Sequence, residues 1–263
     1  MIDLSIVLPT CNRAALLERA IDSVIAITGV NWELIVVDGA STDATPRLLE
    51  RYRQNFGDRI YVHREPQRRG FVKAINEGIG LAQGRNVCWL NDDARPLPGA
   101  LERASHQMDA APGDVGLLAI FHRWHSPRNV AYRLSVNNVT YSLCHVRGTL
   151  YANFAFGRRE TFELLGRLDE RYAFCGADPD LSLKAWHAGF RVEPAWGVCF
   201  DHDEHEDDRR AADADRMAAD NARLFQKWNL PPKNPRRNDF NPAKPCTLIG
   251  MNPAEAATAS IAA

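Results

Sequence analysis

The stretch Cys88–Pro98, CWLNDDARPLP, decides how this chain is interpreted. An apolar run leads into Asn91, Asp92 and Asp93, and prolines follow at positions 96 and 98. The apolar run predicts a buried strand, and the prolines mark the end of regular structure soon after it. Two adjacent carboxylates at a strand end repel each other unless a cation lies near them. The stretch therefore raises the question of what these aspartates bind.

Strand and helix patterns alternate on both sides of this stretch, over about the first 120 residues. Each strand pattern is a short apolar run and each helix pattern carries an apolar stripe. The predicted strands are 2–10, 32–38, 59–63, 86–90 and 115–121, and the predicted helices are 12–26, 45–52, 71–84 and 99–109, with Thr45 as the N-cap of the second helix. This alternation predicts an α/β fold whose parallel sheet has helices on both faces.

Polar residues follow three of these strands directly. They are Thr10-Cys11-Asn12, Asp38 and Asn91-Asp92-Asp93. Parallel sheets of this kind bind ligands at the carboxyl ends of their strands, and core packing does not require polar groups there. We therefore expect a binding site at this edge of the sheet.

The paired aspartates suggest a metal site next to a phosphate group. In isolation, Asp92-Asp93 is more often part of a solvated loop, but the strand end favours a role in binding. Magnesium and manganese take oxygen ligands and keep room for water and substrate phosphates. Such an ion acts as a Lewis acid for a departing phosphate. Asp38, at a neighbouring strand end, is placed to accept hydrogen bonds from a base or ribose.

The region after residue 120 is less regular. It holds β-like runs at 130–136 and 139–143, helix patterns at 158–166, 178–190 and 211–228, and an apolar strand at 195–202. We predict one domain, 1–230, with a regular half at 1–120 and a less regular half at 121–230. Residues 231–263 carry six prolines and predict an extended or disordered tail.

The composition is that of an ordinary globular protein, with 45% hydrophobic and 25% charged residues. The net charge of −1 gives no reason to expect a nucleic-acid partner. The N-terminus lacks a signal-peptide pattern, and we find no run of 18 apolar residues. Six cysteines without CxxC spacing predict reduced thiols. We expect a cytoplasmic protein, with at most a peripheral contact at the inner face of the membrane.

Four segments resemble, in order, motifs of the family-two inverting glycosyltransferases of the GT-A fold. They are SIVLPTCNR (5–13), VVDGASTDAT (36–45), the long segment from Lys73 to Glu102, and LDERYAFCGADPDLSLKAWHAGFRV (168–192). The resemblance implies a Rossmann-like, mostly parallel central sheet flanked by helices. It also implies transfer of a sugar, with inversion, from a UDP-, TDP- or GDP-sugar to a hydroxyl of a sugar, glycolipid or metabolite. It implies that 1–120 is the nucleotide-sugar half and 121–230 the acceptor half. Polysaccharide, glycolipid or glycoconjugate synthesis is the expected setting.

The resemblance also assigns roles to single residues. It implies that Asp178 is the general base and that Asp93 and His202 hold a manganese or magnesium ion. The residues implied to bind the nucleotide are Pro9, Thr10, Asn12, Asp38, Asn76, Asn91 and Asp92.

The chain departs from the family pattern at four positions. Cys11 replaces a tyrosine, Gly39 an aspartate, Ala177 a glutamate and Lys184 an arginine. None of these changes removes the proposed metal aspartate or the base, but together they leave open which base and sugar are bound.

Other interpretations remain at this point. Asp178 could cap the helix that starts near Pro179, and His202 could be a surface histidine in the run DHDEHEDD (201–208), which is most simply a solvated loop. The chain could bind a sugar nucleotide without transferring the sugar. A nucleotidyltransferase is disfavoured, because PTCNRAALLE has one arginine and no glycine to hold a triphosphate. The acceptor, the linkage and the oligomeric state stay open.

Overall fold

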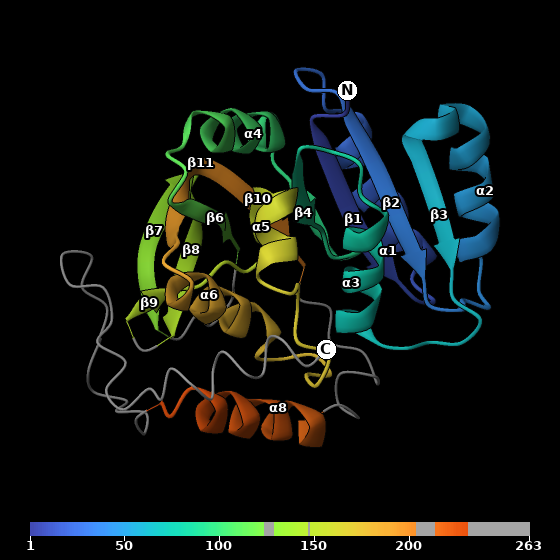
Figure 1. Cartoon of the computed structure of the whole chain (residues 1–263). Helices are drawn as coiled ribbons and strands as arrows, with labels where there is room; N and C mark the ends of the chain where they lie inside the picture. The colour runs from blue at the N-terminus through green and yellow to red at the C-terminus, as the bar shows by residue number, and fades with distance from the viewer. Residues whose placement is uncertain (124–128, 147, 204–213, 231–263) are drawn as a thin grey trace.

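The computed structural model describes residues 1–123, 129–146, 148–203 and 214–230 (Figure 1). The acidic run beyond Asp203 and the predicted tail 231–263 lie outside the described residues.

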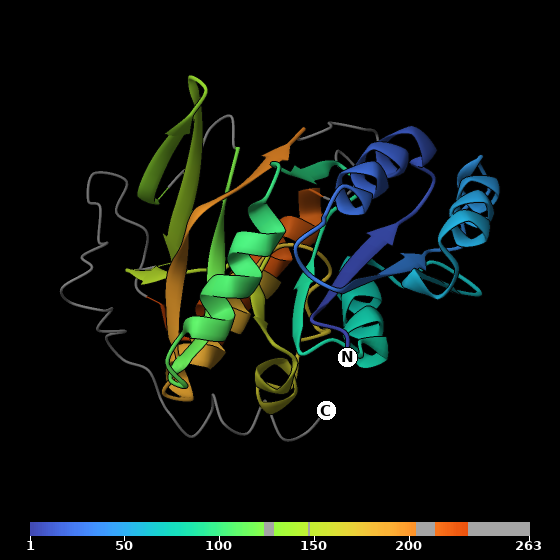
Figure 2. The same ribbon diagram turned by 90° about the horizontal axis from the view of Figure 1, so that it is seen from above.

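The first part of the chain follows the predicted alternation of strands and helices. Its elements are β1 (Leu4–Thr10), α1 (Ala14–Ile25), β2 (Trp32–Asp38), α2 (Thr45–Phe56), the short 3-10 helix η1 (Gly57–Arg59), β3 (Ile60–Arg64), α3 (Phe71–Leu81) and β4 (Asn86–Trp89). Every residue of β1, β2 and β4 is buried, because helices cover both faces of the sheet. Figure 2 shows α1 and α3 on opposite sides of β1.

The start of α2 differs from the prediction by one residue. Thr45 was predicted as the N-cap, but Ala44 holds that position and Thr45 is already helical. Asp43 supplies the side chain at this helix start, because its Oδ1 accepts a hydrogen bond from the Thr45 N–H at 2.9 Å.

The second part of the chain completes the sheet and adds a hairpin. Its elements are β5 (Ala94–Pro96), α4 (Ala100–Ala110), β6 (Val115–His122), β7 (Val130–Val136), β8 (Val139–Val146), β9 (Thr149–Leu150), β10 (Phe156–Arg158), α5 (Arg159–Leu164), α6 (Ala177–His187), β11 (Arg191–His202) and α8 (Ala214–Lys227).

The sheet is mixed, in the order β3-β2-β1-β4-β10-β6-β11-β5. β1, β2, β3 and β4 pair in parallel, as expected. β10 lies antiparallel between β4 and β6, so the predicted parallel alternation does not continue from β4 to β6. Gly157 permits this insertion, because a Cβ there would lie 2.9 Å from the Gly116 carbonyl oxygen.

One buried hydrophobic cluster extends from Leu4 to Leu230 through both parts of the chain. The cysteines at positions 11, 88, 144, 175 and 199 are reduced, outside any disulfide. Among the described residues, we find no helix with the length and apolar character needed to cross a bilayer.

Candidate active site

The carboxyl ends of β1 and β4 bring the first polar residues of the site together. β1 and β4 are neighbours in the sheet, so the residues that follow them meet at one edge. The Thr10 hydroxyl donates a hydrogen bond to Asp92 Oδ2 at 2.9 Å. Arg13, at the start of α1, contacts Asp92 Oδ1 at 3.0 Å and Asp93 Oδ2 at 3.2 Å through one Nη1 atom. The cation that the aspartate pair requires is therefore an arginine in this structure, and sequence reasoning did not assign it.

A short strand that was not predicted brings His202 to this pair. β5 follows Asp93 directly and pairs antiparallel with the end of β11, with Ala94 opposite His202. The Asp203 N–H donates to the Asp93 carbonyl at 2.9 Å. As a result, His202 Nε2 lies 3.3 Å from Asp93 Oδ1. Two residues that are 109 positions apart in the sequence thus share one corner of the site.

The two aspartates differ in their tendency to ionise. Burial raises the pKa of Asp92, and the neighbouring charge of Asp93 adds to this, while Arg13 and Thr10 act in the opposite direction. Burial also disfavours the ionised form of Asp93. There, the hydrogen bond and charge of His202, together with Arg13, outweigh it and lower the pKa. Asp93 is therefore the carboxylate that stays ionised more readily, as a metal ligand must be.

The Asp93–His202 corner fits a divalent cation in part. Asp93 Oδ1 is buried beside His202 Nε2, and within the described residues His202 Nδ1 is buried without a hydrogen-bond partner. An octahedral ion with ligand distances of about 2.1 Å places neighbouring ligands about 3 Å apart, close to the 3.3 Å between Asp93 Oδ1 and His202 Nε2. No cluster of three or more His, Cys, Asp or Glu residues suited to a metal occurs in the described part of the chain. The protein would thus supply two ligands, and substrate oxygens and water the others.

The end of β2 forms the next part of the same edge. Asp38 is buried, and its Oδ1 accepts the Ser41 N–H at 3.0 Å. Asn12 has a positive φ of 54°, and its Oδ1 accepts the Thr42 N–H at 2.7 Å. Asn12 therefore joins the loop after β1 to the loop after β2.

The remaining predicted nucleotide residues lie on or beside the same elements. Pro9 is in β1 and pairs with Val37 of β2. Asn91 follows β4, and its Oδ1 is buried without a hydrogen-bond partner in the part of the chain that the structure describes. Asn76 lies in α3, where its amide donates to the Leu168 carbonyl at 2.8 Å and accepts the Leu168 N–H at 3.0 Å. Asn76 therefore fixes the segment before the GADPD motif to α3.

Asp178 stands at the start of α6, in a different part of the fold. Gly176, with φ of 85°, is the N-cap of this helix, and Asp178 is in its first turn. Asp178 Oδ1 is enclosed and has no hydrogen-bond partner in the described structure, which disfavours the capping alternative. Burial raises the pKa of Asp178 to about 7. A carboxylate with a pKa near the working pH suits a general base.

Asp180, two residues further on, has a structural role. It is 0% exposed and accepts hydrogen bonds from Trp228 Nε1 at 2.6 Å and from Lys227 Nζ at 2.9 Å. Both partners are at the end of α8 and beyond it, so this aspartate ties α6 to the last described segment of the chain.

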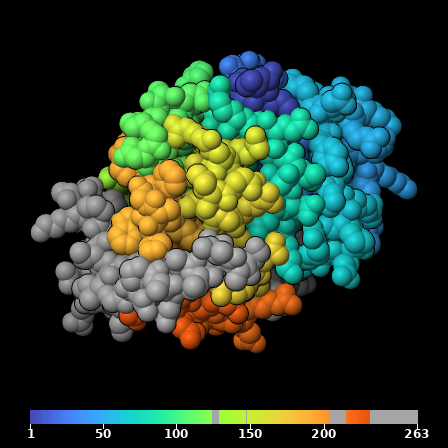
Figure 3. Space-filling model, in the orientation of Figure 1, coloured from blue at the N-terminus to red at the C-terminus, as the bar shows by residue number. Residues whose placement is uncertain are grey.

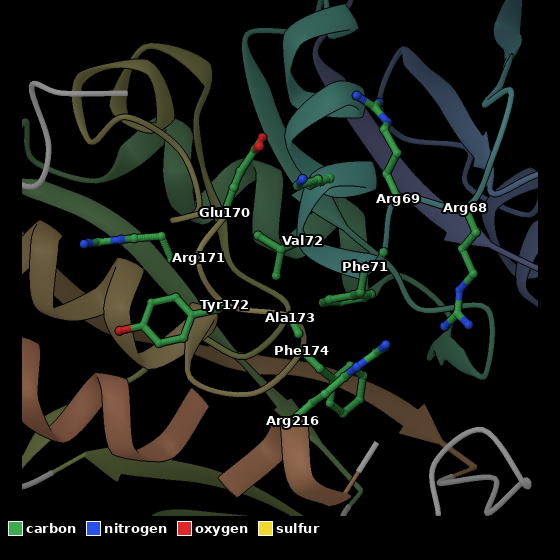
Figure 4. A pocket seen from close by; sticks show the side chains of 12 residues that line it. Arg68, Arg69, Phe71, Val72, Glu170, Arg171, Tyr172, Ala173, Phe174 and Arg216 are labelled. Carbon is green, nitrogen blue, oxygen red and sulfur yellow. The ribbon is translucent and has the colours of Figure 1, made fainter. Parts of the chain in front are cut away.

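A cavity of about 470 Å³ lies beside the GADPD segment (Figure 4). The first turn of α3, the segment 170–174 and Arg216 of α8 line it. Phe71 and Phe174 point toward one another there, with ring centroids 5.8 Å apart. Arg69, which also lines it, is held by Glu65 and Glu77 at 2.8 and 2.9 Å, so its charge is already paired.

The sheet, its flanking helices and the polar carboxyl edge have the arrangement of a GT-A fold. Among solved structures, the chain is similar to a mannosyltransferase from Pyrobaculum calidifontis in complex with GDP-Man and Mn²⁺, with a TM-score of 0.66, 23% identity, and coverage of 89% of this chain and 68% of the other. It is also similar to Staphylococcus aureus TarS in complex with UDP-GlcNAc, with a TM-score of 0.58, 18% identity, and coverage of 85% and 73%.

Sequence comparison adds the family. Residues 5–164 match the model described as "Glycosyl transferase family 2", and the chain belongs to that family. A glycosyltransferase of PGL/p-HBAD biosynthesis from Mycobacterium bovis (strain BCG) is 31% identical over 189 residues, which are 69% of each chain. The succinoglycan biosynthesis protein ExoO of Rhizobium meliloti is 35% identical over 115 residues, which are 44% of this chain and 32% of that protein. The protein is a glycosyltransferase, and its relatives act in glycan biosynthesis.

Three of the four departures from the family pattern have a local explanation. Cys11 donates through its thiol to the Gly39 carbonyl at 3.3 Å, and a Cβ on residue 39 would lie 3.4 Å from the Cβ of Cys11. The small residues at 11 and 39 therefore pack together. Lys184 donates to the Arg167 carbonyl and so contacts the segment that leads to the base. Nothing in the structure explains Ala177.

Proposed function

We propose that this glycosyltransferase moves a sugar from a nucleotide-diphosphate donor to an acceptor hydroxyl, with inversion and with a divalent cation bound. Donor recognition would fall to the edge formed by β1, β2 and β4. Asp38 and Asp92, with Thr10 and Asn12, would hold the nucleoside. The polar contacts among these residues fix their side chains before a ligand arrives, which reduces the cost of ordering them on binding.

Asp93 and His202 would hold manganese or magnesium next to the diphosphate. When bound, such an ion neutralises charge on the leaving nucleoside diphosphate. The ion pair of Arg13 with both aspartates would keep Asp92 ionised in a buried place. The mannosyltransferase structure with GDP-Man and Mn²⁺, and a similar structure of GalNAc-T7 with UDP, GalNAc and Mn²⁺, support this choice of cofactor.

The environment of Asp178 is the observation that carries the proposal. Its unpartnered Oδ1 and raised pKa equip it to accept the proton of the acceptor hydroxyl as that oxygen attacks the sugar. A base that is separate from the donor-binding aspartates allows one displacement, in which the C–O bond to the acceptor forms as the bond to the diphosphate breaks. Such a displacement inverts the anomeric carbon.

The test begins with a thermal-shift screen of UDP-, TDP- and GDP-sugars with and without manganese. A true donor raises the melting temperature by mass action, and only when manganese is present. The selected donor is then followed by NMR in the presence of candidate acceptors, and the product is expected to show the anomeric configuration opposite to that of the donor. A product that retains the donor configuration, or a donor that binds but is never consumed, would contradict the proposal.

A further inference from the structure

The helix α8 lies far from Asp178 in the sequence but beside it in the fold. It forms the lower edge of the molecule in the ribbon and space-filling views, below α6 (Figures 1 and 3). It forms hydrogen bonds with the segment 169–174, which leads toward the base at the start of α6, and with Asp180, just beyond the base.

Asp220 makes the central contact of this helix with the segment. The side chain belongs to a residue that is 1% exposed, so its charge is removed from water. Its Oδ2 accepts the Phe174 N–H at 2.8 Å, and both oxygens lie 3.1 Å from the Ala173 N–H. Arg223, one turn further along α8, donates to the Arg171 carbonyl at 2.5 Å. The backbone of three residues before Cys175, namely Arg171, Ala173 and Phe174, is therefore hydrogen-bonded to α8.

A second contact holds the chain on the other side of the base. Asp180 receives hydrogen bonds from Trp228 and Lys227, as described above, and from the Tyr172 hydroxyl at 3.3 Å. The segment is thus fixed at residues 173–174 and again at residue 180. Asp178 lies between these two points, and among the described residues its Oδ1 has no hydrogen-bond partner that would orient it.

We propose that Asp220 is a positioning residue for the base, which acts by fixing the backbone of residues 173–174 through their amide hydrogens. The proposal rests on the proposed role of Asp178. A base that makes no hydrogen bond of its own must be aimed by its backbone, and a displacement of about 1 Å can lower the rate by about a hundredfold. A buried carboxylate is a strong acceptor for two adjacent N–H groups, because hydrogen bonds to a charged group are shorter and stronger than neutral ones.

The test compares Asp220→Ala with a matched control, Asp215→Ala, which removes an exposed carboxylate from the first turn of the same helix. Turnover, donor KM and donor affinity with manganese are measured on folded protein for both variants and for Asp178→Asn. We expect Asp220→Ala to lower kcat by about tenfold to a hundredfold, with donor affinity within about twofold of the wild type. The control should match the wild type. Asp220→Asn keeps one acceptor oxygen, so its kcat should lie between those of Asp220→Ala and the wild type. If the alanine variant does not fold, the same measurements are made on Asp220→Asn.

A second readout separates positioning from simple stabilisation. If the segment moves, Asp178 gains solvent, and the midpoint of the rise of kcat with pH should shift to lower pH in Asp220→Asn. A variant with a lower melting temperature but wild-type kcat and midpoint would overturn the proposal while leaving the proposed function intact. Near wild-type turnover in Asp178→Asn would instead remove the base, and both proposals with it.

Discussion

Replacing Asp178 with asparagine should make the protein more stable and less active at the same time. The asparagine has nearly the same shape but no charge. Burial raises the pKa of this carboxyl from 3.8 to about 7, a difference of about 3 units, and each unit corresponds to about 1.4 kcal/mol. The full burial penalty would thus be about 4 kcal/mol. Because Asp178 keeps partial contact with solvent, we expect the substitution to raise the free energy of unfolding by about 1–2 kcal/mol. This corresponds to a rise of about 2–8 °C in melting temperature.

The gain in stability from Asp178→Asn should depend on pH in a defined direction. Between about pH 4 and pH 7 the folded state keeps the proton on Asp178, whereas the unfolded state has lost it. The folded state then binds more protons, so the free energy of unfolding of the wild type falls as pH rises through this window. Below about pH 4 both states are protonated and the penalty disappears. The stabilising effect of Asp178→Asn should therefore grow from about pH 4 to pH 7 and then stay constant.

Activity should show the opposite trend. The ionised fraction of a base with a pKa of about 7 rises from about one tenth at pH 6 to about nine tenths at pH 8, so wild-type turnover should rise about tenfold. Asp178→Asn should bind the donor normally and turn over at least about a hundredfold more slowly. Melting curves and nucleoside diphosphate release, measured across this pH range, check both trends. An asparagine variant that is no more stable at pH 8, and equally active, would refute the assignment of a desolvated base.

Two further predictions concern ion pairs. Arg13→Ala should lower the free energy of unfolding by about 1–3 kcal/mol at pH 8, because two buried carboxylates lose their cation. Adding manganese should then raise the melting temperature of this variant more than that of the wild type. Thermal shifts that are equal in the two proteins would argue against a shared cation site. Asp180→Ala should cost about 3–5 kcal/mol in urea unfolding, since Lys227 and Trp228 lose a buried partner; a loss below about 1 kcal/mol would contradict this.

The elements that sequence predicted best are those in which the local pattern and the burial agree. β1, β2 and β4 are fully buried apolar runs, and the polar residues after them meet at one edge as expected. The sequence could not predict the insertion of β10, because three residues carry no usable periodicity and their partners, β4 and β6, are distant in sequence. The same applies to β5, whose pairing with β11 brings His202 to Asp93.

The contacts of single charged residues were also beyond the sequence. Arg13 is part of the motif SIVLPTCNR, but its ion pairs with Asp92 and Asp93 form only because β1 and β4 are neighbours in the sheet. Asp180 looked like a helix-start residue, and only the fold shows that it binds Trp228 and Lys227. Long-range hydrogen bonds of this kind leave no trace in local spacing.

Calorimetric titration of nucleoside diphosphate into the wild type and Asp93→Ala, each with and without manganese, tests the central claim most directly. We predict that manganese strengthens binding to the wild type by at least about tenfold, and that this gain disappears in Asp93→Ala, because the ion would lose the carboxylate that holds it beside the diphosphate. The same affinity with and without manganese in the wild type, or an undiminished gain in the variant, would contradict the account.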